Sequence, residues 1–137
     1  MSSPETAGHL TGQAAILLSK DVSAAVAYWV DRVGFEIVGT WGEPPDFAIV
    51  RRDGRHVMIG SAPEGHEIVP YWKIRQNLWN AYFWVDDVEA IHAELKGRGA
   101  RIDYELCNQP YGVREFGIQD LDGHDIAFGQ VLKPAAP

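Results

Sequence analysis

An internal repeat constrains the fold more than any other feature of this sequence. Lys20-Asp21-Val22 opens one helical pattern, and Asp86-Asp87-Val88 opens another 66 residues later. Apolar residues then recur at helical spacing in both segments. Each aspartate is a natural N-cap, because a carboxylate accepts hydrogen bonds from the free N–H groups of the first turn. Gly34 is expected to end the first helix, and Gly97 or Gly99 the second.

Strand-like segments surround the two helices in the same order. One apolar run precedes each helix, and three strand-like segments follow it. The predicted strands are 14–18, 35–41, 47–51 and 56–60 in the first half, and 81–85, 101–107, 114–119 and 125–131 in the second. The last hairpins have similar sequences, DGRHVMIG and DGHDIAFG, and Asp-Gly is a strong hairpin signal. The chain therefore predicts an α+β fold made of two β-α-β-β-β units.

The repeat also defines the domain organisation. We expect a single domain over residues 12–132, with a first unit at 12–60, a connector at 61–77 and a second unit at 78–132. A four-stranded sheet with one helix has a covered face and an open face. Two units can therefore pair their open faces around a shared cleft, and strand alternation sends every second side chain toward it. The sequence leaves open whether the units pair within one chain or between two chains.

Charge and composition exclude several classes of function. The chain has 137 residues and a net charge of -7, and this acidity argues against a nucleic-acid partner while favouring a cationic ligand. No apolar run is long enough to span a membrane, and the polar N-terminus predicts a cytoplasmic protein without a membrane partner. Cys107 is the only cysteine, so no disulfide can form within the chain and no thiolate-rich metal site is available.

Two segments, SKDVSAAVAYWVDRVGFEIV and YGVREFGIQDLDGHDIAFGQ, together with the repeat, resemble the vicinal oxygen chelate superfamily. That superfamily includes glyoxalase I, the bleomycin-resistance proteins and the extradiol dioxygenases. The resemblance covers about residues 12–132 and implies two mixed sheets that pair around a cleft. It is closest in type to the metal-free bleomycin-resistance members, which often form homodimers with clefts built by both subunits.

The same resemblance implies where a metal ion would bind in the metalloenzymes of the family. The four equivalent positions hold Ala14, Met58, Asn80 and Ala127 in this chain. Alanine cannot coordinate, methionine suits soft ions, and a lone amide is a weak ligand. We therefore expect no metal, no other cofactor and no catalytic residue, and the sequence leans away from an enzyme.

Aromatic side chains are expected to line the cleft instead. If Asn80 points into the cleft, Tyr82 and Trp84 share its face by strand alternation. An arginine among apolar strand residues needs a partner, either a carboxylate or an anionic ligand group. The predicted ligand-binding residues are Trp41, Phe47, Met58, Asn80, Tyr82, Trp84, Arg114 and Phe116.

The leading functional prediction is metal-free binding and sequestration of a small aromatic molecule, with a cationic molecule favoured, as in antibiotic-resistance proteins. We expect a homodimer with a small-molecule ligand. One alternative is a divergent glyoxalase-like lyase, isomerase or dioxygenase with a displaced metal, and Gln13, His56, Asn80 and His124 are then its candidate polar groups. A scaffold that only dimerises or accompanies another protein is a further alternative.

Overall fold

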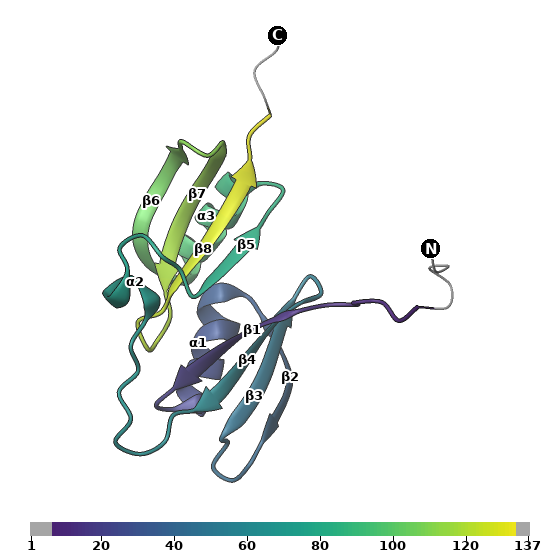
Figure 1. The fold of residues 1–137 in the computed structure, drawn as a ribbon, viewed down its shortest axis with the longest axis vertical. Coiled ribbons are helices and arrows are strands. Elements are labelled where there is room, and N and C mark those ends of the chain that lie inside the picture. Colours follow the sequence, from purple (N-terminus) through teal and green to yellow (C-terminus); the bar gives the residue numbers. More distant parts are fainter. Residues whose placement is uncertain (1–6, 134–137) are drawn as a thin grey trace.

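The computed structural model describes residues 7–133 and contains the predicted repeat of two β-α-β-β-β units (Figure 1). The first unit consists of β1 (Ala14–Ser19), α1 (Val22–Val33), β2 (Glu36–Trp41), β3 (Phe47–Arg52) and β4 (Arg55–Ser61). The second consists of β5 (Ala81–Trp84), α3 (Val88–Arg98), β6 (Arg101–Gln109), β7 (Val113–Gln119) and β8 (Asp125–Val131). A short helix, α2 (Tyr71–Ile74), lies in the connector between them. Among these described residues, no helix is long and apolar enough to cross a membrane.

Each unit forms a four-stranded mixed sheet, which confirms the predicted α+β class. The strand orders are β1-β4-β3-β2 and β5-β8-β7-β6. In both sheets the first strand runs parallel to the last, and the other neighbours are antiparallel. The register repeats as well, because Ile16 lies opposite Met58 in one sheet as Tyr82 lies opposite Ala127 in the other.

The ends of the two long helices follow the expected chemistry. Oδ1 of Asp21 accepts a hydrogen bond from the Ala24 amide, and Asp87 caps α3 in the same way, both at 3.1 Å. Gly34 and Gly99 end the helices in the left-handed conformation, with φ of 80° and 83°. Gly99, rather than Gly97, is therefore the second C-cap.

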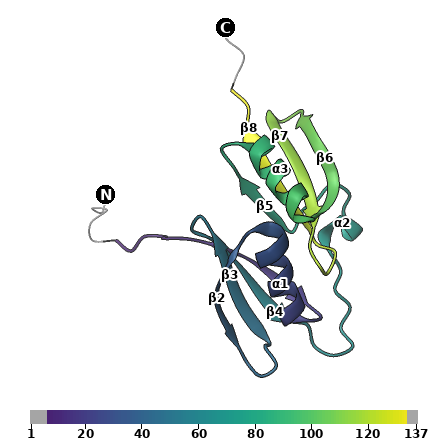
Figure 2. The ribbon, with the colours of Figure 1, turned by 180° about the vertical axis from the view of Figure 1, so that it is seen from behind.

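The two units contact each other mainly through their helices. Both helices lie behind their sheets in Figure 1 and in front of them in Figure 2, so the open faces lie on the same side of the molecule. Arg52 forms an ion pair of 2.6 Å with Glu94 of α3. The Tyr28 hydroxyl of α1 donates to the Gln119 carbonyl at 2.6 Å and accepts from the Arg101 amide at 3.0 Å. One apolar core therefore joins the units, and their open faces do not meet within the chain.

The two hairpins that end the units differ although their sequences are similar. Asp53 and Gly54 form a two-residue turn, in which both have positive φ. The link between β7 and β8 is longer, and Oδ1 of Asp120 holds it by accepting from the amides of Asp122 at 3.0 Å and His124 at 2.8 Å. The second Asp-Gly pair thus lies in a turn organised by an aspartate side chain.

Candidate ligand-binding groove

The open face of the second sheet carries a buried carboxylate, that of Glu115. This residue lies on β7, opposite Gly129 of β8 and Cys107 of β6, and it is fully buried. A carboxylate removed from water needs hydrogen bonds or an opposite charge to compensate it. Within residues 7–133, Glu115 forms no ion pair with a basic side chain. Its compensation therefore comes from hydrogen bonds.

Three tyrosines from different segments supply those hydrogen bonds. The Tyr82 hydroxyl of β5 donates to Oε1 of Glu115 at 2.9 Å, and the Tyr104 hydroxyl of β6 donates to Oε2 at 2.6 Å. The Tyr111 hydroxyl, from the turn between β6 and β7, also donates to Oε1. Nε2 of Gln109 lies 3.5 Å from Oε2. Donors on both oxygens are the arrangement that an ionised carboxylate accepts.

Two glycines allow the tyrosines to reach this carboxylate. A Cβ atom at Gly129 would clash with the hydroxyl of Tyr82, and one at Gly117 would clash with the ring of Tyr104. Both glycines are buried and lie on the same face as Glu115. Because they lack side chains, the tyrosine rings can lie close against the sheet.

The environment keeps the tyrosine hydroxyls protonated, so that they act as donors. Burial is the largest cause that raises the pKa of Tyr82, Tyr104 and Tyr111 above the ordinary value. The hydrogen bond to Glu115, and then its negative charge, raise the pKa of each hydroxyl further. The cluster of Glu115 with its three tyrosines therefore remains a set of O–H donors around one acceptor at neutral pH.

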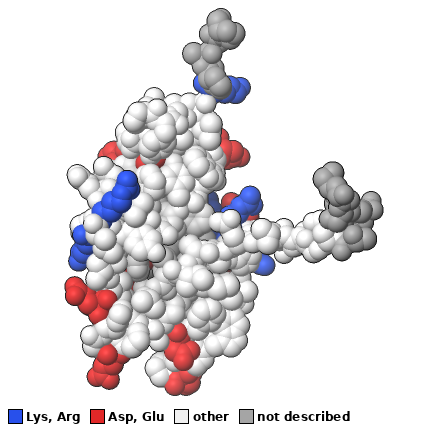
Figure 3. All heavy atoms as spheres, viewed as in Figure 1, with Lys and Arg blue, Asp and Glu red and all other residues white. Residues whose placement is uncertain are grey.

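A groove of about 730 Å³ lies over this cluster. The connector forms one wall with Trp72, Gln76, Asn77 and Trp79, and the rest of the lining comes from the second unit: Asp103, Tyr104, Cys107, Gln109, Pro110, Tyr111, Glu115 and Asp125. The indole N–H of Trp79 donates to the Tyr104 hydroxyl at 3.0 Å, and its ring lies 4.8 Å from that of Tyr82, centroid to centroid. Figure 3 shows that most of the surface on this side is uncharged, with charged side chains mainly near its edges. The groove is therefore aromatic in its walls and acidic in its floor.

A second acidic position lies at the end of the groove where β8 begins. Asp125 is 8% exposed, and its Oδ1 has no hydrogen-bond partner among residues 7–133. Burial, followed by the nearby charge of Asp103, raises the pKa of Asp125 to about 6. The Asp125 carboxyl is therefore expected to change its charge close to neutral pH.

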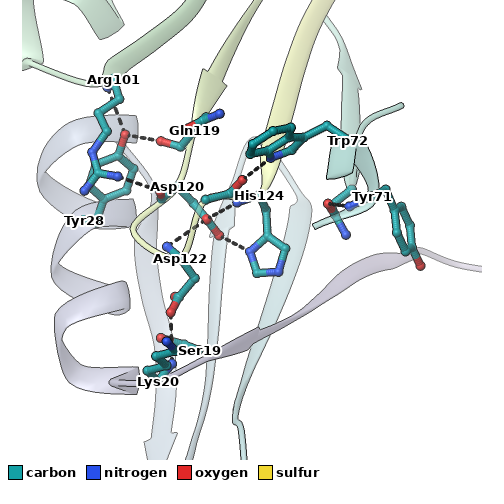
Figure 4. Close-up of polar contacts among 12 residues, drawn as sticks. Ser19, Lys20, Tyr28, Tyr71, Trp72, Arg101, Gln119, Asp120, Asp122 and His124 are labelled. Atoms are coloured by element: carbon teal, nitrogen blue, oxygen red, sulfur yellow. Dashed lines mark hydrogen bonds and ion pairs between the residues drawn. The ribbon is translucent and has the colours of Figure 1, made fainter. Parts of the chain in front are cut away.

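The turn between β7 and β8 fixes the acidic end of the groove (Figure 4). His124 and Asp120 are both buried, and Nδ1 of His124 lies 2.8 Å from Oδ2 of Asp120. The Trp72 indole of the connector donates to the Gly123 carbonyl at 2.7 Å. Oδ1 of Asp122 accepts from the Lys20 amide of the first unit at 3.0 Å. His124 thus takes part in a structural network, while Asp125 follows it directly in sequence.

Three of the predicted ligand-binding residues belong to the first unit. Trp41 and Phe47 contact each other on its open face, with ring centroids 5.7 Å apart, and Met58 lies on the same face. Ile16 and Leu18 of β1 extend this face and are exposed, Ile16 by 73%. The structure therefore places Trp41, Phe47 and Met58 away from the groove, on an apolar face of their own.

The predicted orientation of Arg114 and Phe116 toward the cleft is wrong. Phe116 is fully buried under α3, stacked on Phe128 at 5.3 Å between ring centroids. Nε of Arg114 lies 3.1 Å from Oε1 of Glu89 on α3. Strand alternation puts Glu115 on the open face and these two neighbours on the helix-covered face. Arg114 does have the partner that its position requires, but this partner is the carboxylate of Glu89 and not an anionic group of a ligand.

The remaining predicted residues have different roles. The Tyr82 hydroxyl bonds Glu115, whereas Trp84 is 64% exposed and packs its ring 4.7 Å from that of Tyr82. Trp84 also lines a separate cavity of about 310 Å³. Oδ1 of Asn80 accepts from the Tyr71 amide at 3.1 Å, which holds α2 in place. Of the eight residues predicted from the sequence, only Tyr82 joins the cluster under the groove.

The metal positions implied by the sequence resemblance do not fit a divalent ion. Ala14 and Ala127 have no donor side chain, and the Asn80 amide oxygen already accepts a backbone hydrogen bond. Across the part of the chain that the structure describes, no group of three or more histidine, cysteine, aspartate or glutamate side chains is placed to hold a metal. Glu115 itself is surrounded by hydroxyl donors, which is unsuited to coordination.

Sequence reasoning missed Glu115, Tyr104 and Asp103 as parts of the groove. The sequence did contain a signal for Glu115. It lies on a predicted strand between Arg114 and Phe116, so its side chain must point to the face opposite theirs. Only one of the two charged residues, Arg114 or Glu115, can face the helix. The nearby Tyr104 and Tyr111, with Gly117, are what favours the open face for the glutamate.

Comparisons with known proteins agree with the fold. The model of the Glyoxalase/Bleomycin resistance protein/Dioxygenase superfamily matches residues 6–128. The bleomycin-binding protein from Streptomyces verticillus, solved with copper(II)-bleomycin, is 28% identical, with a TM-score of 0.66 over 93% of this chain and 100% of that one. TioX from Micromonospora sp. ML1 is 23% identical, with a TM-score of 0.70 over 89% and 99% of the two chains.

A third similar structure, a glyoxalase/bleomycin resistance protein/dioxygenase from Alicyclobacillus acidocaldarius, is 13% identical, with a TM-score of 0.73 over 90% of this chain and 92% of that one. No curated protein sequence matches the chain. The repeat, the two mixed sheets and a family match over nearly the whole chain lead to one conclusion: this protein belongs to the Glyoxalase/Bleomycin resistance protein/Dioxygenase superfamily.

Proposed function

We propose that this protein binds a small aromatic molecule, preferably a cationic one, in the groove over Glu115 and holds it unchanged without a metal ion. The observation that carries this proposal is an aromatic groove whose floor contains carboxylates and whose lining, within residues 7–133, contains no lysine or arginine. Aromatic walls favour a flat apolar body through stacking, and carboxylates favour a positive charge on it. The likeness to a bleomycin-binding protein supports a binding role of this kind.

We further propose that a second copy of the chain completes the site. The open face of the first unit exposes the apolar side chains of Ile16, Leu18 and Trp41, and Phe47 and Met58 lie half-buried beside them. An apolar face of this kind favours contact with another protein surface. In a homodimer this face would cover the open face of the partner's second unit. Trp41, Phe47 and Met58 would then take the ligand-facing role that the sequence predicts for them.

A fluorescence titration tests the proposed function. Tryptophans line the groove at positions 72 and 79, so a bound aromatic ligand should quench or shift their emission. We expect saturable quenching by cationic aromatic antibiotics, bleomycin among them, and recovery of each ligand intact by mass spectrometry. The variant Tyr104→Leu, which removes part of the groove wall, should weaken binding about tenfold or more. Phe116→Leu, in the core, is the matched control and should leave ligand affinity almost unchanged. A chemically altered ligand would point instead to an enzyme.

A further inference from the structure

Asp125 differs from Glu115, the other buried carboxylate in the lining of the groove. The two oxygens of Glu115 accept hydrogen bonds from three tyrosines, so this carboxylate has little capacity left for a ligand donor. Asp125 is also buried, though slightly less so, at 8% exposure, and its Oδ1 has no partner within residues 7–133. A buried acceptor without a donor is unfavourable, and proteins keep such groups mainly where something else satisfies them.

The position of Asp125 is fixed by its backbone. Its carbonyl accepts from the Asn80 amide at 2.9 Å, and its neighbour His124 is held by Asp120. Asp125 shares its face with Ala127 and Gly129, because strand residues two apart point the same way. The carboxyl therefore faces the groove from a rigid strand rather than from a mobile loop.

The charges around Asp125 favour a cation. The charged groups that act on it are Asp103, from β6, and Asp120, from the β7–β8 turn, and both are negative. Gln119 of β7 is its neutral neighbour across the sheet, and a hydrogen bond from this side chain lowers the pKa of Asp125, whereas one with Asp103 raises it. A neutral donor could satisfy Oδ1, but only a positive charge would also offset the charges of the two nearby carboxylates. A metal ion fits poorly, because no three-ligand group exists in the described chain.

The sheet also fixes the distance between the two buried carboxylates of the groove, those of Glu115 and Asp125. Glu115 lies opposite Gly129, and Asp125 precedes Gly129 by four residues on the same strand. At about 3.3 Å per residue, the two positions are about 13 Å apart along the sheet. Tyr104 lies between them, because it is opposite Gly117, which is opposite Ala127. A flat ligand body over Tyr104 and Trp79 would thus bring a substituent at one end to Asp125.

We propose that Asp125 anchors the cationic nitrogen of the ligand, by accepting a hydrogen bond from a protonated amine or amidine. This proposal rests on the proposed function, since it assigns the polar end of the same groove. Glu115 has a different role: it holds the tyrosines in place and adds negative charge without touching the cation. The ligand class is therefore an aromatic molecule with a protonated nitrogen at one end.

A matched pair of ligands tests this assignment. The probes are 9-(aminomethyl)anthracene, a cation at neutral pH, and 9-(hydroxymethyl)anthracene, which has nearly the same shape and no charge. Calorimetric titrations at pH 7.5 would give both affinities for the wild-type protein, Asp125→Asn and Asp31→Asn. The last variant removes an exposed carboxylate from α1 and is the control for net charge.

The wild type and Asp31→Asn should bind the amine at least about tenfold more tightly than the alcohol, because a buried carboxylate favours the cation. Asp125→Asn should reduce this preference to about twofold while leaving affinity for the alcohol almost unchanged. If Asp125→Asn kept the full preference for the amine over the alcohol, Asp125 would not be the anchor of the cation. The proposal of an aromatic binding groove would still stand. Failure of both probes to bind the wild type would overturn the proposed function itself, and the anchor with it.

A second measurement avoids any substitution. Side-chain carboxyl signals in carbon NMR follow the titration of Asp125 in the wild-type protein. Because burial and Asp103 raise the pKa of Asp125 to about 6, saturation with the amine should lower that pKa by a unit or more, whereas the alcohol should not. An equal shift with both probes, or none with the amine, would contradict a direct contact between Asp125 and the cation.

Discussion

The open faces of the two units are built on the same backbone but differ in side chains. Because the strand register is the same in both sheets, positions of the first unit have equivalents in the second. Ile16 is equivalent to Tyr82, Leu18 to Trp84, Phe47 to Glu115, Ile49 to Gly117, and Met58 to Ala127. In the first unit, large apolar side chains cover the middle of the face. In the second, a glycine and an alanine leave room there, and tyrosines at the sides reach a central carboxylate. A repeated fold can therefore carry two surfaces with different chemistry, one apolar and one acidic.

The largest expected effect comes from removing the central carboxylate. Glu115→Leu leaves the hydroxyls of Tyr82 and Tyr104 without their acceptor, while exposed Tyr111 can turn to water. Since a buried unpaired hydroxyl costs about 1–3 kcal/mol, the free energy of unfolding should fall by about 2–4 kcal/mol in urea titrations. Phe47→Leu, at the equivalent position of the first unit, should lower it by less than about 1 kcal/mol. Equal losses in both variants would remove the difference that we draw between the faces.

A glycine exchange tests the space that the second face needs. In Gly117→Ala the new Cβ collides with the ring of Tyr104, which must move. We expect the free energy of unfolding to fall by about 1–3 kcal/mol, as in other overpacked sites, and ligand binding to weaken. Gly60→Ala is the matched control in the first unit, because nothing lies within 4 Å of its Cβ position. Thermal denaturation should show Gly60→Ala at least as stable as the wild type.

Replacing Asp125 should change the stability by an amount that depends on pH. Its pKa is raised from 3.8 to about 6 in the folded chain, so the folded protein binds the proton more readily than the unfolded chain does. The carboxyl therefore favours folding most at low pH, and this contribution is lost as the pH rises through about 6. Asp125→Asn should raise the free energy of unfolding by about 1–2 kcal/mol at pH 8. Near pH 4 the gain should disappear.

Denaturant titrations at the two pH values check the prediction for Asp125→Asn. A gain of the same size at pH 4 and pH 8 would show that burial of the charged form is not its cause. If the prediction holds, the substitution raises the stability of the protein but weakens its binding of a cationic ligand. Such a trade-off is common for charged groups in binding sites.

The smallest effect on the stability of the single chain is expected at Ile16. This side chain is 73% exposed, so Ile16→Asp should change the free energy of unfolding by less than about 0.5 kcal/mol at low protein concentration. In a homodimer that buries the first face, the same variant should weaken self-association about tenfold or more in sedimentation experiments. Ile37→Asp, on the opposite side of the sheet beside Val50, should leave association unchanged. Identical sedimentation of wild type and Ile16→Asp would count against the proposed dimer.

Much of the fold could be predicted from the sequence because it depends on local signals. Helix caps at Asp21 and Asp87 are set by neighbouring residues, and the strand segments follow from periodicity and turns. The predicted strand limits differ from the observed ones by no more than two residues. Gly99 could not be separated from Gly97, because either can end a helix and only the left-handed conformation decides between them.

The groove was harder to predict because its chemistry depends on distant residues. Glu115 is compensated by Tyr82 and Tyr104, which lie 33 and 11 residues away in sequence. On β7 a charged residue occurs on each face, so alternation alone does not show which of Arg114 and Glu115 is covered by the helix. The position of Tyr82 could be predicted because it lies two residues after Asn80, at the start of the predicted strand 81–85. Arg114 and Phe116 were misplaced because the alternation of β7 was assigned to the wrong face.

The turn between β7 and β8 has a consequence for how the chain unfolds. It contacts the first unit through Asp122 and Lys20, and the connector through Gly123 and Trp72. The strand that leads into it meets α1 through Gln119 and Tyr28. If either unit unfolded, the other would therefore lose these hydrogen bonds and part of the shared apolar core. Despite its repeat, the chain should unfold in one cooperative transition, with neither half forming a stable intermediate.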